Sequence, residues 1–211
     1  DIGRKPIWSR FFETLGEDVY LASMMGKSII DGYQGSTIID DYHVAACLKH
    51  YVGYSVPKSG RDRTPALIPE RTMQELHLPV FRKAIDQGAL TVMVNSGEVN
   101  GIPGHANKYL LTDVLKDEWG FQGFAISDWE DFLNLHKVAQ TDSTVKDAIA
   151  TAINAGVDMS MVPNNPEYKN YCNLLVELVR EGKVSEKRLN DAVRRIIRVK
   201  YYANLFKDSH S

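Results

Sequence analysis

Charged side chains stand directly after two apolar segments of the sequence. Lys49 and His50 follow the run Val44–Leu48, and Asp128 follows Phe124-Ala125-Ile126. Carboxylates, lysines and histidines are the groups that proteins use as nucleophiles and as general acids or bases. A charged group at the end of a buried strand needs a partner or contact with solvent. These positions are therefore candidates for a functional site.

Each candidate also has a structural interpretation, and the pattern leaves both open. Lys49 can extend its ammonium group to solvent at the rim of a sheet. Glu98 lies in the stretch Asn95–Pro103, whose Asn-Gly pair and proline are typical of turns, so it can be a solvated loop charge or a site carboxylate. Asp128 can cap the helix that follows it, or act as a nucleophile with Trp129 beside it to stack on a sugar ring.

The elements that must hold these residues alternate between strand and helix. Nearly continuous apolar runs predict strands over 44–48, 89–94, 124–126 and 157–162, as expected for strands covered on both faces. Helical spacing, caps and glycine stops predict helices over 18–34, 70–86, 112–120, 145–155, 166–181 and from 185 onward. This alternation predicts a parallel sheet with helices outside it.

Individual residues sharpen those boundaries. Thr112 and Ser143 are expected N-caps, and Pro166 fits a first helical turn. Pro79 should kink or shorten its helix. Cys47 is expected to be a small buried hydrophobic residue. The last helix should carry one apolar stripe, formed by Leu189, Val193, Ile196, Ile197 and Tyr201.

Length and composition limit the class of protein. The chain has 211 residues, of which 44% are hydrophobic and 25% charged, with a formal net charge of −2. Those values exclude a disordered tail and give no attraction to nucleic acid or anionic lipid. No apolar run approaches the roughly 18 residues of a membrane span. Neither CxxC nor HExxH occurs, so the sequence carries no close metal-binding motif.

Both an open doubly wound sheet and a (β/α)8 barrel fit the alternation. No GxGxxG or GxxxxGK[ST] motif follows an expected strand, which weakens the nucleotide-binding open sheet. A barrel would place its active site just after the strands, where Lys49, His50 and Asp128 lie. Asp158, inside the fourth apolar run, needs a buried partner, and we expect its role to be structural.

Longer motifs occur at intervals along the whole chain. They are Asp1-Ile2-Gly3-Arg4 with Glu13-Thr14-Leu15-Gly16-Glu17-Asp18, Lys49-His50-Tyr51-Val52-Gly53, Asn100-Gly101-Ile102-Pro103, Trp119-Gly120-Phe121-Gln122-Gly123, Ser127-Asp128-Trp129 and Ala155-Gly156-Val157-Asp158-Met159. In these motifs and their order the chain resembles glycoside hydrolase family 3, in its β-glucosidase-type branch. The resemblance implies the C-terminal half of a (β/α)8 TIM-like barrel over residues 1–206, with 207–211 as the start of a linker or tail.

The resemblance also implies a retaining glycosidase that uses no metal and no cofactor. Asp128 would attack the anomeric carbon of a β-linked glucoside or gluco-oligosaccharide, and water would hydrolyse the resulting covalent glycosyl-enzyme. Basic side chains suit this site because they bind hydroxyls and oppose the charge of the nucleophile. The residues that would contact the non-reducing-end sugar are Arg10, Lys49, His50, Arg63 and Trp129.

Two departures from the family pattern affect the expected site. Ser96 stands where many members carry a tyrosine near the nucleophile, so that contact must differ here. Tyr54-Ser55-Val56-Pro57 does not match the longer motif of the N-acetylglucosaminidase branch, which carries its acid/base residue in the barrel. The glucosidase branch places its acid/base glutamate in a second α/β domain. We therefore expect that domain and the remaining half of the barrel as partners within the same protein, and expect this chain alone to be inactive.

Other classes of function remain open. The chain can be a non-catalytic carbohydrate-binding or structural fragment of such a protein. An unrelated barrel enzyme acting on phosphorylated substrates is disfavoured, because Pro163-Asn164-Asn165-Pro166 offers no glycine-rich phosphate loop. The resemblance implies a secreted, extracellular or periplasmic protein. The sequence does not distinguish glucose from xylose in the substrate.

Overall fold

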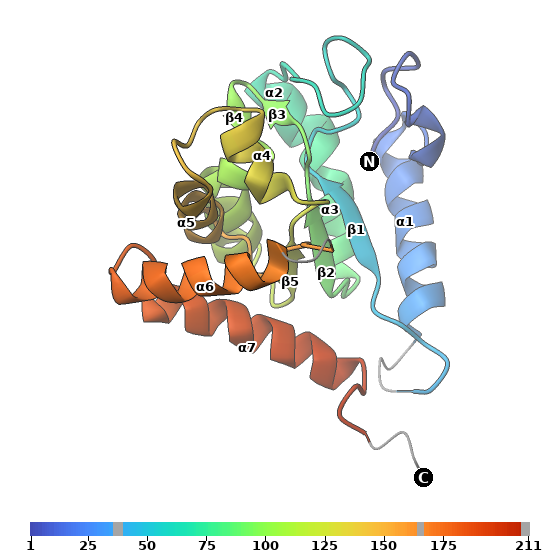
Figure 1. Cartoon of the computed structure of the whole chain (residues 1–211). Coiled ribbons are helices and arrows are strands. Elements are labelled where there is room, and N and C mark those ends of the chain that lie inside the picture. Colours follow the sequence, from blue (N-terminus) through green and yellow to red (C-terminus); the bar gives the residue numbers. More distant parts are fainter. Residues whose placement is uncertain (36–39, 164–166, 208–211) are drawn as a thin grey trace.

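The computed structural model describes residues 1–35, 40–163 and 167–207 and has a parallel sheet at its centre (Figure 1). Its strands are β1 (Cys47–Tyr51), β2 (Thr91–Val94) and β5 (Phe124–Ile126), in the order β1-β2-β5. The expected strand over 157–162 contributes a single parallel bridge, between Ile126 and Met159. Spatial order follows chain order without a reversal, which is the order of a barrel. The fold is therefore a partial α/β barrel, as predicted.

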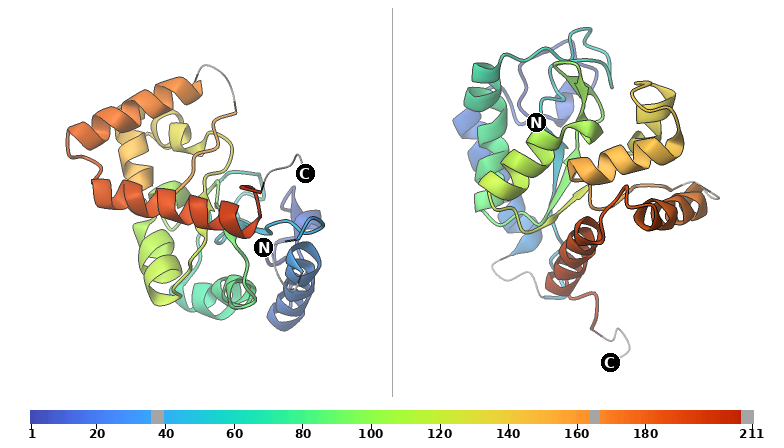
Figure 2. Two further views of the ribbon diagram at one scale, coloured as in Figure 1. Left: turned by 90° about the horizontal axis from the view of Figure 1, so that it is seen from below. Right: turned by 90° about the vertical axis from the view of Figure 1, so that its left-hand side faces the viewer.

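Helices follow the strands and surround the sheet (Figures 1 and 2). The α-helices are α1 (Val19–Gln34), α2 (Glu70–Thr72), α3 (Leu78–Asp86), α4 (Asp131–Lys137), α5 (Val145–Ala155), α6 (Glu167–Arg180) and α7 (Glu186–Tyr202). The 3-10 and π elements are η1 (Phe11–Glu13), η2 (Met73–His77), η3 (Gly104–Ala106) and η4 (Tyr109–Glu118). A short antiparallel pair, β3 (Glu98–Val99) and β4 (Ile102–Pro103), lies in the loop after β2.

Several local signals act as the sequence predicts. The Asp18 carboxylate accepts the Leu21 N–H at the start of α1, and the Ser185 hydroxyl accepts the Arg188 N–H at the start of α7. Pro79 has no N–H to continue the helical ladder. The helix over 70–86 accordingly widens into the π turn η2 just before it, and then continues as α3.

The expected boundaries of two helices were wrong. Thr112 does not cap the helix now seen as η4, because Asn107 accepts the Leu110 N–H at 3.0 Å and starts the helix earlier. The Thr112 hydroxyl donates instead to the carbonyl of Ala155. Thr144, one residue after the expected Ser143, caps α5. Pro166 lies outside the described residues.

The first strand begins later than predicted, so Lys49 and His50 lie in β1 rather than after it. Side chains, rather than a neighbouring strand, satisfy the backbone before it, since Gln34 accepts the Ala46 N–H and Thr91 donates to the Ala46 carbonyl. Cys47 was expected to be buried, but it is exposed at the start of this strand.

The apolar stripe of the last helix packs only in part. Ala192 and Val199 are the residues of α7 that are buried. Val193, Ile197 and Tyr201 are 43%, 51% and 64% exposed, so part of the predicted stripe is not covered by other described residues. In the described part of the chain, no helix combines the length and apolar character that crossing a membrane requires.

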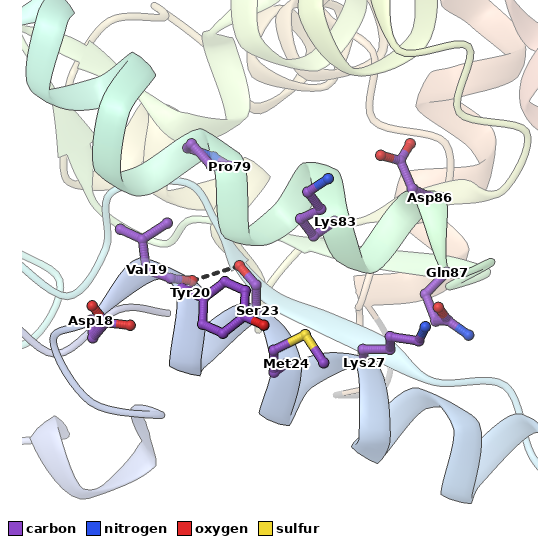
Figure 3. Close-up of a pocket in the computed structure, with 10 residues that line it drawn as sticks. All are labelled: Asp18, Val19, Tyr20, Ser23, Met24, Lys27, Pro79, Lys83, Asp86 and Gln87. Atoms are coloured by element: carbon purple, nitrogen blue, oxygen red, sulfur yellow. Dashed lines mark hydrogen bonds between the residues drawn. The ribbon is translucent and has the colours of Figure 1, made fainter.

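A cavity of about 660 Å³ lies between α1 and α3, as Figure 3 shows. Its lining mixes apolar and charged side chains, including Tyr20, Met24, Lys83 and Asp86. None of the predicted site residues lines it. The chemistry that the sequence predicts must therefore be sought elsewhere, at the ends of the strands.

Asp158 is held by buried ion pairs, as the structural interpretation predicts. Its Oδ1 accepts hydrogen bonds from Lys116 Nζ, at 2.7 Å, and from Arg188, while its Oδ2 accepts the Ala125 N–H at 2.9 Å. Burial lowers the pKa of Lys116 to about 8. The cluster ties η4 and α7 to β5, directly before Asp128.

We predict that Asp158→Asn destabilises the protein by about 3–5 kcal/mol, because it leaves the buried ammonium of Lys116 without a countercharge. Urea denaturation of the protein checks this. Glu181→Gln is the matched control, since Glu181 pairs with Lys146 at the exposed surface, where solvent screens the pair, and should leave the free energy of unfolding nearly unchanged. Equal effects of the two substitutions would contradict the prediction.

Candidate active site

Asp128 stands at the carboxyl end of β5 with one oxygen anchored and the other unpaired. Its Oδ1 accepts the Trp129 N–H at 2.6 Å and lies 3.4 Å from Arg63 Nη2. Its Oδ2 is buried and has no hydrogen-bond partner within the described residues. The side chain does not cap α4, because Glu130 occupies the N-cap position without a capping hydrogen bond. A fixed carboxylate with one available oxygen can act as a nucleophile.

His50, from β1, faces that available oxygen. Its Nε2 lies 3.5 Å from Asp128 Oδ2 and 3.4 Å from Arg10 Nη2. Its backbone N–H donates to Asp1 Oδ2 at 2.9 Å. Arg10 is held in turn by two hydrogen bonds to Glu13, of 2.7 and 2.8 Å. The ion pair of Arg10 and Glu13 therefore supports one side of the site.

Tyr54 packs beside His50 and completes this side. Its ring centroid lies 4.6 Å from that of His50 and 5.4 Å from that of Trp8. Its hydroxyl donates to Asp62 at 2.5 Å and accepts from Arg10 Nη1 at 3.2 Å. Burial raises the pKa of Tyr54, so the phenol keeps its proton.

A second group of polar residues lies on the other side of Asp128. Arg63 Nη1 donates to Asp131 Oδ1 at 2.7 Å, and Asn134 donates to the same oxygen at 2.6 Å. Ser96 donates to the other oxygen of Asp131. This group lines a cavity of about 200 Å³.

His105 contacts the backbone of Asp128 and lies close to the side chain of Asp131. Its Nε2 accepts the Asp128 N–H at 3.2 Å, and its Nδ1 lies 3.9 Å from Asp131 Oδ2. Accepting at Nε2 requires the proton on Nδ1, so the ring is neutral. Burial lowers its pKa to about 3.

Burial also controls the charge of the other titratable groups. It lowers the pKa of His50 to about 4, with the positive charge of Arg10 adding to the effect. It raises the pKa of Asp131 to about 6. Near neutral pH both histidines beside Asp128 are therefore uncharged, and the cation in direct contact with its carboxylate is Arg63.

The structure gathers four of the six predicted site residues, namely Arg10, His50, Arg63 and Asp128. Lys49 is exposed, and its ammonium lies 3.5 Å from Glu13 rather than at Asp128. Trp129 follows Asp128 and is half exposed.

Sequence reasoning missed the residues that support this group. Tyr54 stood in a segment quoted for another reason, and neither His105 nor Asp131, three residues after Asp128, was assigned a role. The spacing gives no sign that Asp131 reaches Arg63 and Ser96, which are far from it in the chain. Among the described residues, no cluster of three or more histidine, cysteine or acidic side chains is arranged to hold a metal ion.

Comparisons with known proteins identify the family to which this fold belongs. The chain is 46% identical over 215 residues to the lysosomal beta glucosidase of Dictyostelium discoideum, covering 99% of this chain and 26% of that protein. It is 36% identical to the periplasmic beta-glucosidase of Salmonella typhimurium, covering 100% of this chain and 27% of that protein. It thus spans about a quarter of the length of these relatives.

Solved structures give the same result. The β-glucosidase from Listeria innocua in complex with glucose superposes with a TM-score of 0.91 at 36% identity, covering 99% of this chain and 28% of that one. Residues 1–199 match the family described as the glycosyl hydrolase family 3 N terminal domain. The chain belongs to glycosyl hydrolase family 3.

Proposed function

We propose that this chain is part of a retaining β-glucosidase in which Asp128 is the nucleophile. The observation that carries the proposal is the asymmetry of its carboxylate. Oδ1 is anchored by the Trp129 N–H and Arg63, whereas Oδ2 is buried without a partner and faces His50. An anomeric carbon placed against Oδ2 would meet an oriented carboxylate.

The proposed reaction has two steps. In the first, Oδ2 of Asp128 forms a bond to the anomeric carbon while the bond to the leaving-group oxygen breaks, and a general acid protonates that oxygen. In the second, the same group takes a proton from water, which attacks the anomeric carbon and releases Asp128. Neither step requires a metal or a redox cofactor.

Hydroxyl recognition would come from the basic side of the site. Arg10 and His50 line the approach to Oδ2, and both present ring or guanidinium nitrogens. The side chain of Lys49 is exposed, so it would turn away from Glu13 to reach the sugar. Arg63 would bind at the other side, and the half-exposed Trp129 would pack against the ring.

We propose that the general acid and the rest of the barrel lie in other parts of a longer protein. Three carboxylates near Asp128 are already engaged, Glu13 by Arg10, Asp62 by Tyr54 and Asp131 by Arg63. The relatives are about four times longer, which leaves room for a second domain. In this scheme residues 1–206 form the barrel part and 207–211 begin the connection, of which 208–211 lie outside the described residues.

The proposed substrate is a β-linked glucoside or gluco-oligosaccharide, cleaved from its non-reducing end. The support is that the relatives are named β-glucosidases and that a similar structure holds glucose. A secreted or organellar location is proposed on the same basis, since one relative is named lysosomal and another periplasmic. The alternative is a non-catalytic carbohydrate-binding or structural role.

We predict that Asp128→Asn lowers kcat for an aryl β-glucoside by at least about 10⁴-fold, because an amide cannot form the glycosyl ester. An activated 2-fluoro-glucoside should label the wild-type protein on the peptide that contains Asp128, as intact mass and peptide mapping would show. Asp142→Asn is a matched control, since Asp142 bonds Thr141 and Thr151 away from the site. Turnover by the Asp128→Asn variant would contradict the assignment, and sugar binding without any labelling would favour the non-catalytic alternative.

We predict that His50→Ala weakens the binding of glucose about 10-fold, because it removes a buried polar contact beside Oδ2. Because the pKa of His50 is lowered to about 4, this histidine stays neutral from pH 5 to 8, and its contribution should be constant over that range. Calorimetric titration at pH 5 and pH 7 checks both points. His43→Ala is the control, as His43 pairs with Asp40 in another part of the chain. Unchanged affinity in the His50 variant would exclude it from the binding site.

A further inference from the structure

Arg63 contacts two carboxylates at once, and their contacts differ. Its Nη1 lies 2.7 Å from Asp131 Oδ1, while its Nη2 lies 3.4 Å from Asp128 Oδ1. The shorter and better formed ion pair is the one with Asp131. The position of the guanidinium is therefore set by Asp131, and Asp128 receives the remaining donor.

Asp131 is itself fixed on both oxygens. Oδ1 accepts from Asn134 as well as from Arg63, and Oδ2 accepts from Ser96. The side chain is buried, so it has no free position from which to reach a substrate.

The backbone on both sides of this ion pair is held in a costly conformation. Arg63 has a φ of 56° and Glu130, which precedes Asp131, has a φ of 53°. Left-handed backbone costs a residue other than glycine on the order of 1 kcal/mol. Neither residue is a glycine, so the chain keeps two strained positions that bring Arg63 and Asp131 together.

We propose that Asp131 is a positioning residue that holds Arg63 against Asp128 and so sets the orientation of the nucleophile. This inference rests on the proposed function, because it assigns Asp131 a role in the attack by Asp128. Asp131 acts through Arg63 and does not touch the substrate.

The charged groups around Asp131 come from several elements. Arg63 comes from the loop after β1, Asp128 follows β5, His105 lies in η3, and Glu98 of β3 lines the same cavity. Burial raises the pKa of Asp131 to about 6, so its proton leaves between pH 5 and 7. Because the pKa of Asp131 is higher in the folded protein than in the unfolded chain, its ionisation lowers the free energy of unfolding as the pH rises. Asp131→Asn would remove this loss of stability above pH 6.

The test is the rate at which the activated 2-fluoro-glucoside labels Asp128, measured against pH in the full-length protein. Asp131→Asn keeps the shape but removes the charge. We expect labelling to slow about 10- to 100-fold at pH 7. We also expect the acidic limb of the rate profile to move to lower pH, with no fall in melting temperature. Asp142→Asn is the matched control, because it removes a carboxylate that bonds Thr141 and Thr151 rather than Arg63 or Asp128, and it should leave the limb in place.

A double-mutant cycle with Arg63→Met isolates the proposed connection. If Asp131 acts through Arg63, adding Asp131→Asn to Arg63→Met should slow labelling by less than about 3-fold. Fully multiplicative effects would overturn the inference, as would an Asp131→Asn variant with unchanged labelling and an unmoved limb. A wild-type protein that is not labelled at all would instead overturn the proposed function.

Discussion

The site depends on the ion pairs and hydrogen bonds of one buried carboxylate, that of Asp158. It pairs with Lys116 from η4 and Arg188 from α7, and it also accepts the Ala125 N–H inside β5. The segment that carries it bonds to the residues next to Asp128, since Ser127 N–H donates to the Met159 carbonyl. Burying charged groups costs desolvation free energy, which only well-oriented partners offset. The pairing of Asp158 with Lys116 and Arg188 therefore fixes the end of β5.

At that strand end, the residues around Asp128 fix the position of its backbone and its carboxylate. His105 accepts a hydrogen bond from the Asp128 N–H. Arg63 and the Trp129 N–H hold Oδ1 of the Asp128 carboxylate. Burial keeps His50 and His105 neutral, so the positive charge that contacts the Asp128 carboxylate is the guanidinium of Arg63. In the proposed function, Arg63 and Asp131 would orient the nucleophile, while Arg10 and His50 on the other side would recognise hydroxyl groups.

The sequence predicted the parts of the structure that depend on local signals. Apolar runs located β2 and β5, helical spacing located α1, and Ser185 located the start of α7, because these signals act over a few residues. Where non-local contacts decide, prediction failed. The start of β1 depends on Gln34 and Thr91, and the ion pair between Arg63 and Asp131 joins residues 68 positions apart. Motif order supplied Asp128, Arg10 and His50 but carried no sign of the residues that hold them.

The outer edge of β1 has a practical consequence for anyone who produces this chain. Among the described residues β1 pairs with no strand other than β2. Asp1 bonds the Lys49 carbonyl and the His50 N–H at its carboxyl end, whereas Cys47 is exposed at its start. The neighbouring helix α1 also exposes Tyr20, Leu21 and Tyr33. An open strand edge beside apolar side chains is a template for pairing between molecules. Recombinant chain kept at high concentration would therefore associate through β1, and a reducing buffer would be needed to prevent cross-linking through Cys47.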